Sequence, residues 1–213
     1  MEKITILVTD DHTLIRQTCS MILNADPRFK VVAESGSGEQ AVEMVKELQP
    51  NIVIMDINLP GMNGVEATKL IKKISPGTKI LAVSMYTQPL YAITMIKQGA
   101  KGYVTKNSSH REFYHAIIEI HNNRTYLSND VKAILADQML SDDKQKDGIN
   151  SLTSKEIEVI KFIKNGCSSK EIANLLGIAK KTVEVHRHNI LKKLNLKNTA
   201  AMVNHINSQQ LFF

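Results

Sequence analysis

The first 125 residues repeat one pattern, a short apolar run followed by a segment of helix length, and this repetition restricts the possible folds strongly. The apolar runs have strand length and lie at Ile4–Thr9, Phe29–Ala33, Ile52–Met55, Ile80–Val83 and Gly102–Thr105. Amphipathic segments of helix length follow them near residues 12–24, 38–48, 63–74, 88–98 and 109–122. Strands that alternate with helices predict a parallel sheet with helices on both faces. Residues 1–125 are therefore predicted to form a five-stranded, doubly wound α/β domain.

The strand pattern ends after this domain. A helix is predicted over residues 128–140, and residues 141–148 contain no large apolar side chain. A polar stretch of this kind is typical of a solvated linker between domains. We therefore expect a linker at residues 126–149 that contains the predicted helix, and a second domain at residues 150–213.

The second domain is predicted to be entirely helical. Helix start and stop signals recur there, at Thr153-x-x-Glu156, Asn165–Gly166, Ser168-x-x-Glu171 and Gly177. The first and third of these have the capping-box spacing, and glycine accepts the left-handed conformation that ends many helices. Two more helices are predicted near residues 180–194 and 198–207. The pattern indicates four short helices.

The net charge of +6 belongs to the second domain. Residues 1–125 hold 14 Lys and Arg against 12 Asp and Glu, residues 126–147 hold 3 against 5, and residues 148–213 hold 10 against 4. A basic excess confined to one domain favours a polyanionic partner, with DNA or RNA first in line.

Neither a membrane nor an oxidising compartment is indicated by the composition. No apolar run approaches the roughly 20 residues that span a bilayer, and the N-terminus lacks the pattern of a signal peptide. Cys19 and Cys167 are far apart and have no metal-ligand partners at useful spacing. We therefore expect a cytoplasmic protein with no membrane association, whose cysteines are structural rather than disulfide-bonded or metal-binding.

Polar side chains with complementary chemistry stand where the predicted strands end. Asp10 and Asp11 end the first strand, Asp56 the third, Ser84 the fourth and Lys106 the fifth. Ligands of doubly wound sheets bind beyond the carboxyl ends of the strands. Carboxylates so close together repel one another and are stabilised by a hard cation such as Mg²⁺. Any one of these residues could simply begin a loop, but the whole set favours in-line phosphoryl transfer to a carboxylate.

Residues 3–124 resemble the receiver domain of bacterial two-component response regulators, which has a flavodoxin-like fold. The resemblance rests on Val8–His12, Ile54–Gly64, Ser84 and Gly102–Lys106. It implies that Asp56 accepts a phosphoryl group from a sensor histidine kinase and forms an acyl phosphate. The implied magnesium ligands are Asp11, Asp56 and the main-chain carbonyl of Asn58, with Asp10 helping through water.

The same resemblance implies roles for three residues of the last two strands. Ser84 would hydrogen-bond the phosphoryl oxygens and Lys106 would pair with them, while Tyr103 would turn inward as Ser84 moves toward the phosphate. The sequence departs from the family at Asn107, where many receivers have a proline. Many receivers also have a cis peptide at that bond, and a cis form without proline costs about 2.5–4 kcal/mol, so the isomer of this bond stays open.

Residues 148–210 resemble the four-helix helix-turn-helix of the NarL/FixJ class of regulators, also called LuxR-type. The matching segments are Leu152–Glu156, Asn165–Ala173, Leu176–Ile178 and Lys181–Arg187. The resemblance implies a double-stranded DNA partner, dimerisation on phosphorylation, and a recognition helix near residues 180–194.

Helical spacing on this segment separates a core stripe from a basic face. Val183, Ile190 and Leu194 form the stripe. The predicted DNA-contacting residues are Lys180, Lys181, Thr182, Glu184, Val185, Arg187, His188 and Lys192, and Lys193 is a further candidate for a phosphate contact. Glu184 is a candidate specificity residue, because glutamate can accept from cytosine N4. Ala179 stands where the family often has a capping Ser or Thr, which leaves the start of the helix open.

Together the two resemblances cover nearly the whole chain and imply a transcription factor that is not an enzyme. Phosphoryl transfer to Asp56 would control homodimerisation and sequence-specific DNA binding. One alternative is an aspartyl-nucleophile phosphatase of the haloacid dehalogenase type, which needs a second acid where this chain has Asn58. Others are a phosphorylation-independent DNA-binding regulator and a protein- or RNA-binding output. Salt-dependent binding to duplex DNA would separate these cases.

Overall fold

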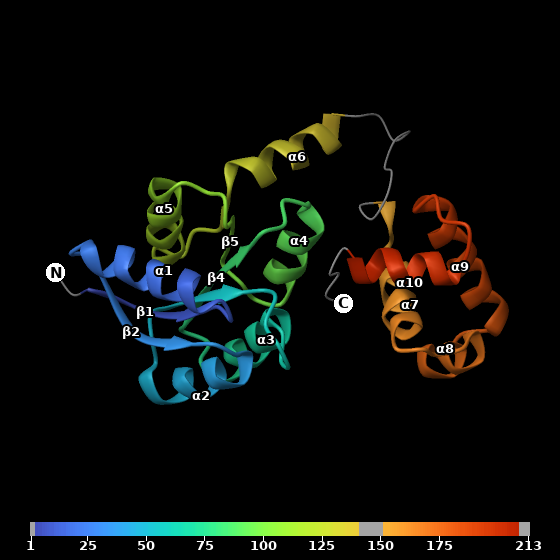
Figure 1. Cartoon of the computed structure of the whole chain (residues 1–213), viewed down its shortest axis with the longest axis horizontal. Coiled ribbons are helices and arrows are strands. Elements are labelled where there is room, and N and C mark those ends of the chain that lie inside the picture. Colours follow the sequence, from blue (N-terminus) through green and yellow to red (C-terminus); the bar gives the residue numbers. More distant parts are fainter. Residues whose placement is uncertain (1–2, 141–150, 209–213) are drawn as a thin grey trace. The chain divides into compact units, whose positions relative to one another are not determined.

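The chain divides into two compact units, Met1–Met139 and Leu140–Phe213 (Figure 1). The structure is a computed structural model, and it describes residues 3–140 and 151–208. The polar stretch predicted at 141–148 and residues 209–213 lie outside the described residues. The limits of the linker at 126–149 therefore stay a prediction.

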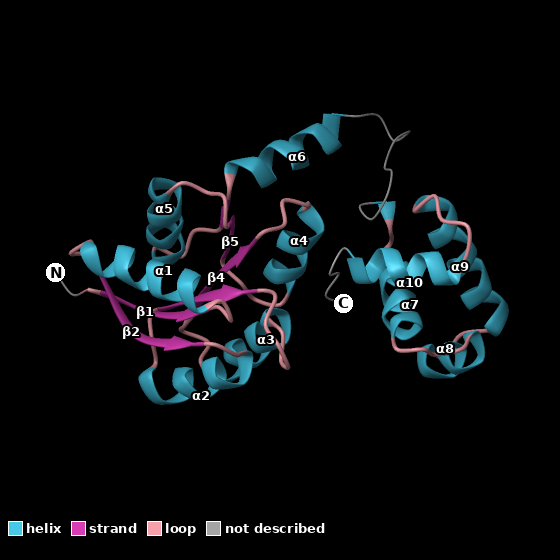
Figure 2. Cartoon of the chain, viewed as in Figure 1, coloured by secondary structure: helices cyan, strands magenta, loops and turns pink. Residues whose placement is uncertain are grey.

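The first unit is a parallel sheet of six strands in the order β2-β1-β3-β4-β5-β6 (Figure 2). The strands are β1 (Ile4–Thr9), β2 (Phe29–Ser35), β3 (Ile52–Asp56), β4 (Lys79–Ser84), β5 (Gly102–Thr105) and β6 (Tyr126–Leu127). The helices are α1 (Thr13–Ala25), α2 (Gly38–Leu48), α3 (Gly64–Ile74), α4 (Pro89–Lys97), α5 (His110–His121) and α6 (Asn129–Leu140). The predicted doubly wound α/β fold and the predicted helix near 128–140 are confirmed.

The sheet has one strand more than the sequence predicted. β6 pairs with β5, with Gly102 opposite Tyr126 and Tyr103 opposite Leu127. The main-chain N–H of Ser128 then donates to the Tyr103 carbonyl at 2.9 Å. A strand of two residues shows no periodicity in the sequence, and this one falls in the segment predicted as linker. The chain therefore returns to the sheet before α6 begins.

Alternating side chains on the strands form two apolar layers. Ile6 of β1 and Ile54 of β3 face α1 and α5, where they pack in one buried cluster with Leu23 and Ile117. Because successive residues of a strand point to opposite faces, the intervening side chains face the layer of α2, α3 and α4 (Figure 1). All five residues of β3 are buried, as its continuous apolar run predicted.

The segment between β3 and α3 is held tightly against the end of β3. A Cβ built on Gly64 would lie 2.0 Å from the Asp56 carbonyl oxygen, so a side chain cannot be accommodated there. The Asn63 side chain accepts from the main-chain N–H groups of Val65 and Glu66, both at 3.0 Å, and caps α3. These contacts place Asn58, in the same loop, beside Asp56.

The second unit contains the four predicted helices, α7 (Ser154–Lys164), α8 (Ser169–Leu176), α9 (Lys180–Lys193) and α10 (Thr199–Ser208). Both predicted capping boxes form, at Thr153 and at Ser168. Gly177 has a φ of 64° and ends α8 in the left-handed conformation. The predicted core stripe of α9 is buried. Among the helices described in either unit, none combines the length and apolar character that crossing a membrane requires.

Candidate functional site

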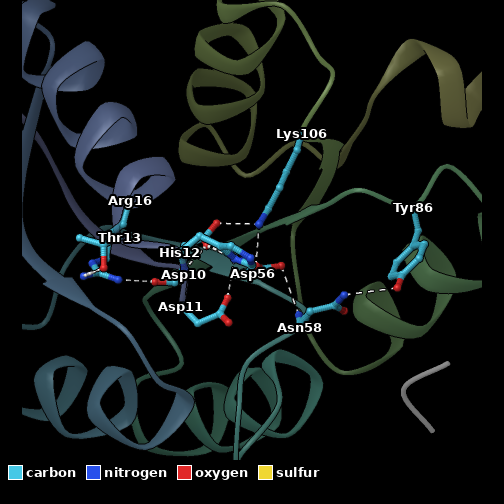
Figure 3. Close-up of polar contacts among 9 residues, drawn as sticks. All are labelled: Asp10, Asp11, His12, Thr13, Arg16, Asp56, Asn58, Tyr86 and Lys106. Carbon is cyan, nitrogen blue, oxygen red and sulfur yellow. Dashed lines mark hydrogen bonds and ion pairs between the residues drawn. The ribbon is translucent and has the colours of Figure 1, made fainter. Parts of the chain in front are cut away.

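The carboxyl ends of β1, β3 and β5 bring three aspartates and a lysine together (Figure 3). Ligand atoms of Asp10, Asp11, His12 and Asp56 all lie within 4.8 Å of one another. Asp10 and Asp56 are almost fully buried, at 5% and 2% exposed. Parallel strands end at one edge of the sheet, so side chains more than 40 positions apart meet there.

Lys106 bridges the two buried carboxylates. Its Nζ lies 2.7 Å from Asp10 Oδ2 and 2.7 Å from Asp56 Oδ2. Burial lowers the pKa of Lys106, but the hydrogen bonds and negative charges of Asp10 and Asp56 outweigh it and raise the pKa. The ammonium therefore stays protonated and holds the two carboxylates in place.

The pKa of Asp56 is raised despite this contact. Burial is the largest cause, and the charge of Asp10 adds to it, whereas the Lys106 ammonium and the main-chain N–H of Asn58 act in the opposite direction. One lysine is thus insufficient to offset the cost of burying this carboxylate beside another. A second cation at this position would favour the ionised, nucleophilic form of Asp56.

The donor set fits a hard divalent cation. Asp10, Asp11 and Asp56 offer carboxylate oxygens, and Mg²⁺ is held in proteins mainly by carboxylates and water. Asp11 is partly exposed, so the cluster is open to solvent on that side. Asn58 lies close enough for its N–H to donate to Asp56 Oδ1 at 3.2 Å, which places its backbone at the same edge.

Ser84 and Tyr103 both form hydrogen bonds with the main chain of Tyr86, whose side chain contacts the site. Ser84 is fully buried, and its Oγ accepts from the Tyr86 main-chain N–H at 3.2 Å. The Tyr103 ring is also fully buried, and its hydroxyl donates to the Tyr86 carbonyl at 2.7 Å. The Asn58 amide donates to the Tyr86 hydroxyl at 3.4 Å (Figure 3). The structure thus connects the loop after β4 with the loop after β3.

The sequence reasoning missed two supporting side chains, Arg16 and Tyr86. Arg16 donates to the Asp10 main-chain carbonyl at 2.6 Å and lies 3.5 Å from Glu34, so it fixes the end of β1 against β2. Arg16 lies six positions after Asp10, in a helix that begins soon after the strand, and this spacing could have predicted its contact with the end of β1. No local pattern predicts the contacts of Tyr86, because they depend on residues of two other segments.

The structure also bears on the isomer of the Lys106–Asn107 bond, which the sequence left open, and on the two cysteines, which were expected to be structural. The Lys106–Asn107 peptide bond is trans, as are the other peptide bonds of the described residues. Cys19 and Cys167 are both free thiols. Burial, with smaller contributions from Asp10 and Glu34, raises the pKa of Cys19 to about 12, so this thiol is not a ready nucleophile.

In the second unit, α9 presents a polar and basic face to solvent. Seven of the eight predicted DNA-contacting residues are exposed, namely Lys180, Lys181, Thr182, Glu184, Val185, His188 and Lys192. Lys180 and Glu184 pair at 3.4 Å on this face. An apolar side chain amid them, Val185, is 51% exposed. Basic and apolar groups on one open helix face can contact both phosphates and base edges.

Two basic residues of α9 point elsewhere. The Arg187 guanidinium is half-buried and donates to the hydroxyls of Ser169 at 3.3 Å and Thr199 at 3.1 Å, so it ties α9 to α8 and α10. The Lys193 ammonium lies 2.7 Å from the buried carboxylate of Glu156 at the start of α7. Both contacts stabilise the helical unit itself. A direct DNA contact by Arg187 stays a prediction.

Comparison with known families agrees with this geometry. A family model described as the response regulator receiver domain matches residues 6–118, more than half of the chain. A second, described as bacterial regulatory proteins of the luxR family, matches residues 150–206. The chain belongs to the response regulators. Its two units are a receiver domain and a LuxR-type DNA-binding domain.

Two similar proteins align with this response regulator, one over most of its length and the other over about two thirds of it. The oxygen regulatory protein NreC of Staphylococcus carnosus (strain TM300) is 33% identical over 212 residues, which cover 97% of this chain and 98% of the relative. A LuxR-family response regulator from Aurantimonas sp. SI85-9A1 is 32% identical, with a TM-score of 0.63 over 66% of this chain and 100% of that one.

A third similarity concerns the fold alone. RcsB from Salmonella enterica serovar Typhimurium, solved bound to a promoter in the presence of the phosphomimetic BeF3⁻, has a TM-score of 0.67. It is 21% identical, and the similarity covers 98% of this response regulator and 100% of that chain.

The capping carboxylate of α7 gives a test of the DNA-binding unit. Glu156 is 2% exposed and accepts from Thr153 N–H and Lys193 Nζ, both at 2.7 Å. Glu156→Ala is expected to destabilise this unit by about 2 kcal/mol, because it removes a helix cap and a charged hydrogen bond. Hydrogen exchange of α9 amides in the full-length response regulator measures that loss.

The same residue predicts a pH dependence. Burial raises the pKa of Glu156, but the hydrogen bonds from Lys193 and Thr153 outweigh it, so the folded-state pKa is lowered. The stabilisation is therefore complete above the ordinary value of 4.5 and is lost as the pH falls through the folded-state pKa. Glu158→Ala, on the same helix but in a surface pair with Lys155, should change stability by less than about 0.5 kcal/mol. Equal losses in the two variants would contradict the role of Glu156.

Proposed function

We propose that phosphoryl transfer from a sensor histidine kinase to Asp56 controls homodimerisation and sequence-specific DNA binding by this transcription factor. The observation that carries the proposal is the buried Asp56 carboxylate, 2.7 Å from Lys106 and within a cluster of acidic ligand atoms. Membership of the response regulator family and the exposed basic face of α9 support DNA binding as the activity that is controlled.

The chemistry follows from the groups around Asp56. A carboxylate oxygen attacks the phosphorus of a phosphohistidine, so that an O–P bond forms while the P–N bond breaks and the imidazole leaves. Lys106 then moves with its ammonium toward the phosphoryl oxygens, and the buried Ser84 hydroxyl donates to them. Asp10, Asp11, Asp56 and the Asn58 carbonyl would hold Mg²⁺, which supplies charge neutralisation at the phosphoryl oxygens when bound.

A new group of about −1.5 to −2 charges beside Lys106 would change the contacts that this lysine makes. The chain from Ser84 through Tyr86 to Tyr103 gives the change a physical path, because each of these residues is joined to the next by a hydrogen bond. A full on–off switch requires a bias of roughly 5.5 kcal/mol between two states.

On the DNA side, α9 is proposed as the recognition helix in the major groove. Lys181 and Lys192, which are exposed, would contact phosphates, while the exposed Glu184, Val185 and His188 would read base edges. We propose that the response regulator acts in the cytoplasm, where a kinase and the chromosome are both accessible.

A selection from random duplex DNA tests the proposal. Protein loaded with Mg²⁺ and beryllium fluoride, a phosphoryl mimic, is compared with untreated protein. A motif of two half-sites enriched only by the loaded protein is the expected result, because a dimer reads two copies of one half-site. Equal enrichment by both samples would contradict control by Asp56, and no enrichment would contradict DNA binding.

A further inference from the structure

A hollow at the amino ends of β4 and β5 lies at the opposite end of these strands from Asp56. Its volume is about 570 Å³. It is bounded by the chain after α3, the starts of β4 and β5, the turn after α4 and the segment between α5 and β6. Hollows of roughly 300–1,000 Å³ are typical of sites for small molecules.

Three lysines line this hollow, Lys72, Lys79 and Lys101, and no acidic residue is among the side chains that line it. All three are partly buried. Burial lowers the pKa of Lys72, and the positive charges of Lys101 and Lys79 lower it further. Glu119, on the neighbouring α5, is engaged by Arg124 at 2.6 Å. Among the described side chains that line the hollow, the positive charge is therefore not balanced by an acidic residue.

Main-chain contacts hold two of the lysines in place without neutralising them. Lys72 Nζ donates to the carbonyls of Pro76 and Thr78, the latter at 2.9 Å, and Lys79 Nζ donates to the His121 carbonyl at 2.8 Å. An ammonium group has three N–H donors, so each keeps at least one for a ligand. Because their positions are already fixed, binding an anion would cost little side-chain ordering.

We propose that this hollow binds a small phosphate-bearing anion of the diphosphate class. Lys72, Lys79 and Lys101 supply charge, while Asn123 and Thr125 in the same lining supply amide and hydroxyl donors. An anion with several charges matches three cations better than a monoanion does. The proposal is independent of phosphorylation at Asp56, since the two sites lie at opposite ends of the sheet.

Calorimetric titration of the full-length protein with inorganic pyrophosphate tests the proposal. The buffer contains no magnesium, and its ionic strength is held near 0.15 M. We expect saturable binding with a Kd below about 1 mM. In amide NMR spectra the largest shifts should fall on Gly77 and Gly99, which line the hollow.

Matched variants separate the site from the general charge of the protein. Lys101→Ala should weaken binding about tenfold or more, and Lys101→Arg should retain it. Lys30→Ala removes the same charge from β2, at the far edge of the sheet, and should leave the Kd unchanged. Thermal unfolding of each variant establishes that it is folded.

Three results would overturn the proposal. Wild-type affinity in Lys101→Ala would mean that Lys101 does not contact the anion. An equal loss in Lys30→Ala would mean that the lysines act only through net charge. NMR shifts confined to α9 would assign pyrophosphate binding to the DNA-binding domain.

Discussion

Asp56→Asn is expected to abolish phosphorylation by a kinase or a small phosphodonor. The amide that replaces the carboxylate cannot act as the nucleophile, so incorporation of phosphoryl groups should fall about 100-fold or more, to background. Electrophoresis that separates the phosphorylated from the unphosphorylated protein measures this directly. Asp137→Asn makes the same chemical change at an exposed position of α6 and should be phosphorylated like the wild type.

Asp56→Asn is also expected to stabilise the receiver domain. The pKa of Asp56 is raised in the folded state, chiefly by burial and also by Asp10, so ionisation of this carboxyl works against folding. An acid with a raised folded-state pKa favours folding at low pH, and this contribution is lost as the pH rises above 3.8 through the folded-state pKa. Asparagine is neutral at every pH, so it removes this loss of stability at higher pH. Its side-chain oxygen can still accept a hydrogen bond from Lys106.

Thermal unfolding without magnesium should therefore show a higher midpoint for Asp56→Asn than for the wild type at pH 7. A difference of 1 kcal/mol moves the midpoint of a domain this size by about 4 °C, which is easily resolved. The gap should narrow as the pH falls toward 4, and magnesium should raise the midpoint of the wild type more than that of the variant. A lower midpoint in Asp56→Asn would show that the ionised carboxylate stabilises the receiver.

Lys181→Glu is expected to weaken DNA binding by about tenfold or more. Lys181 is exposed in the first turn of α9, on the proposed recognition face. Reversing its charge removes one phosphate contact and introduces repulsion, so the slope of log affinity against log salt should become shallower by about 1. Fluorescence anisotropy with the selected duplex, at several salt concentrations, gives both quantities for the protein loaded with beryllium fluoride.

Lys161→Glu is the matched control for this prediction. It changes the net charge of the DNA-binding domain by the same amount from an exposed position in the last turn of α7. Its effect should be limited to a weak change in affinity through the overall field. If the two variants lose affinity equally and with equal salt slopes, α9 is not the recognition helix.

Most of the architecture was predictable because its signals are local. Each strand from β1 to β5 is a short apolar run, and each helix has either periodicity or a capping residue. The second strand runs two residues further than predicted, to Ser35, and β6 was not predicted at all. Both differences involve pairing with a neighbouring strand, which depends on residues distant in the sequence. Local patterns contain little information about such pairing.

The candidate site likewise has residues that the sequence predicted and contacts that it did not. Asp10, Asp11, Asp56 and Lys106 were predicted to lie together because each stands at the end of a strand or just after it, and parallel strands end together. Whether Lys106 would bridge two carboxylates could not be read from the sequence, since that depends on the reach of its side chain. The positions of Arg187 and Lys193 were equally hidden, because helical spacing places a side chain on a face but does not fix the partner it finds. Their partners lie on other helices of the same unit.

The central position of β1 has a consequence for how the two domains acquire their structure. β1 pairs with both β2 and β3, and Asn51 accepts from the main-chain N–H of Thr5, 46 positions away, at 2.8 Å. Such pairing yields no stabilisation until a long loop has closed, which slows folding. The DNA-binding domain instead begins from capped turns whose contacts span three or four residues. We therefore expect the receiver to fold more slowly than the DNA-binding domain, and we expect its strands to be most prone to aggregate while the sheet is still incomplete.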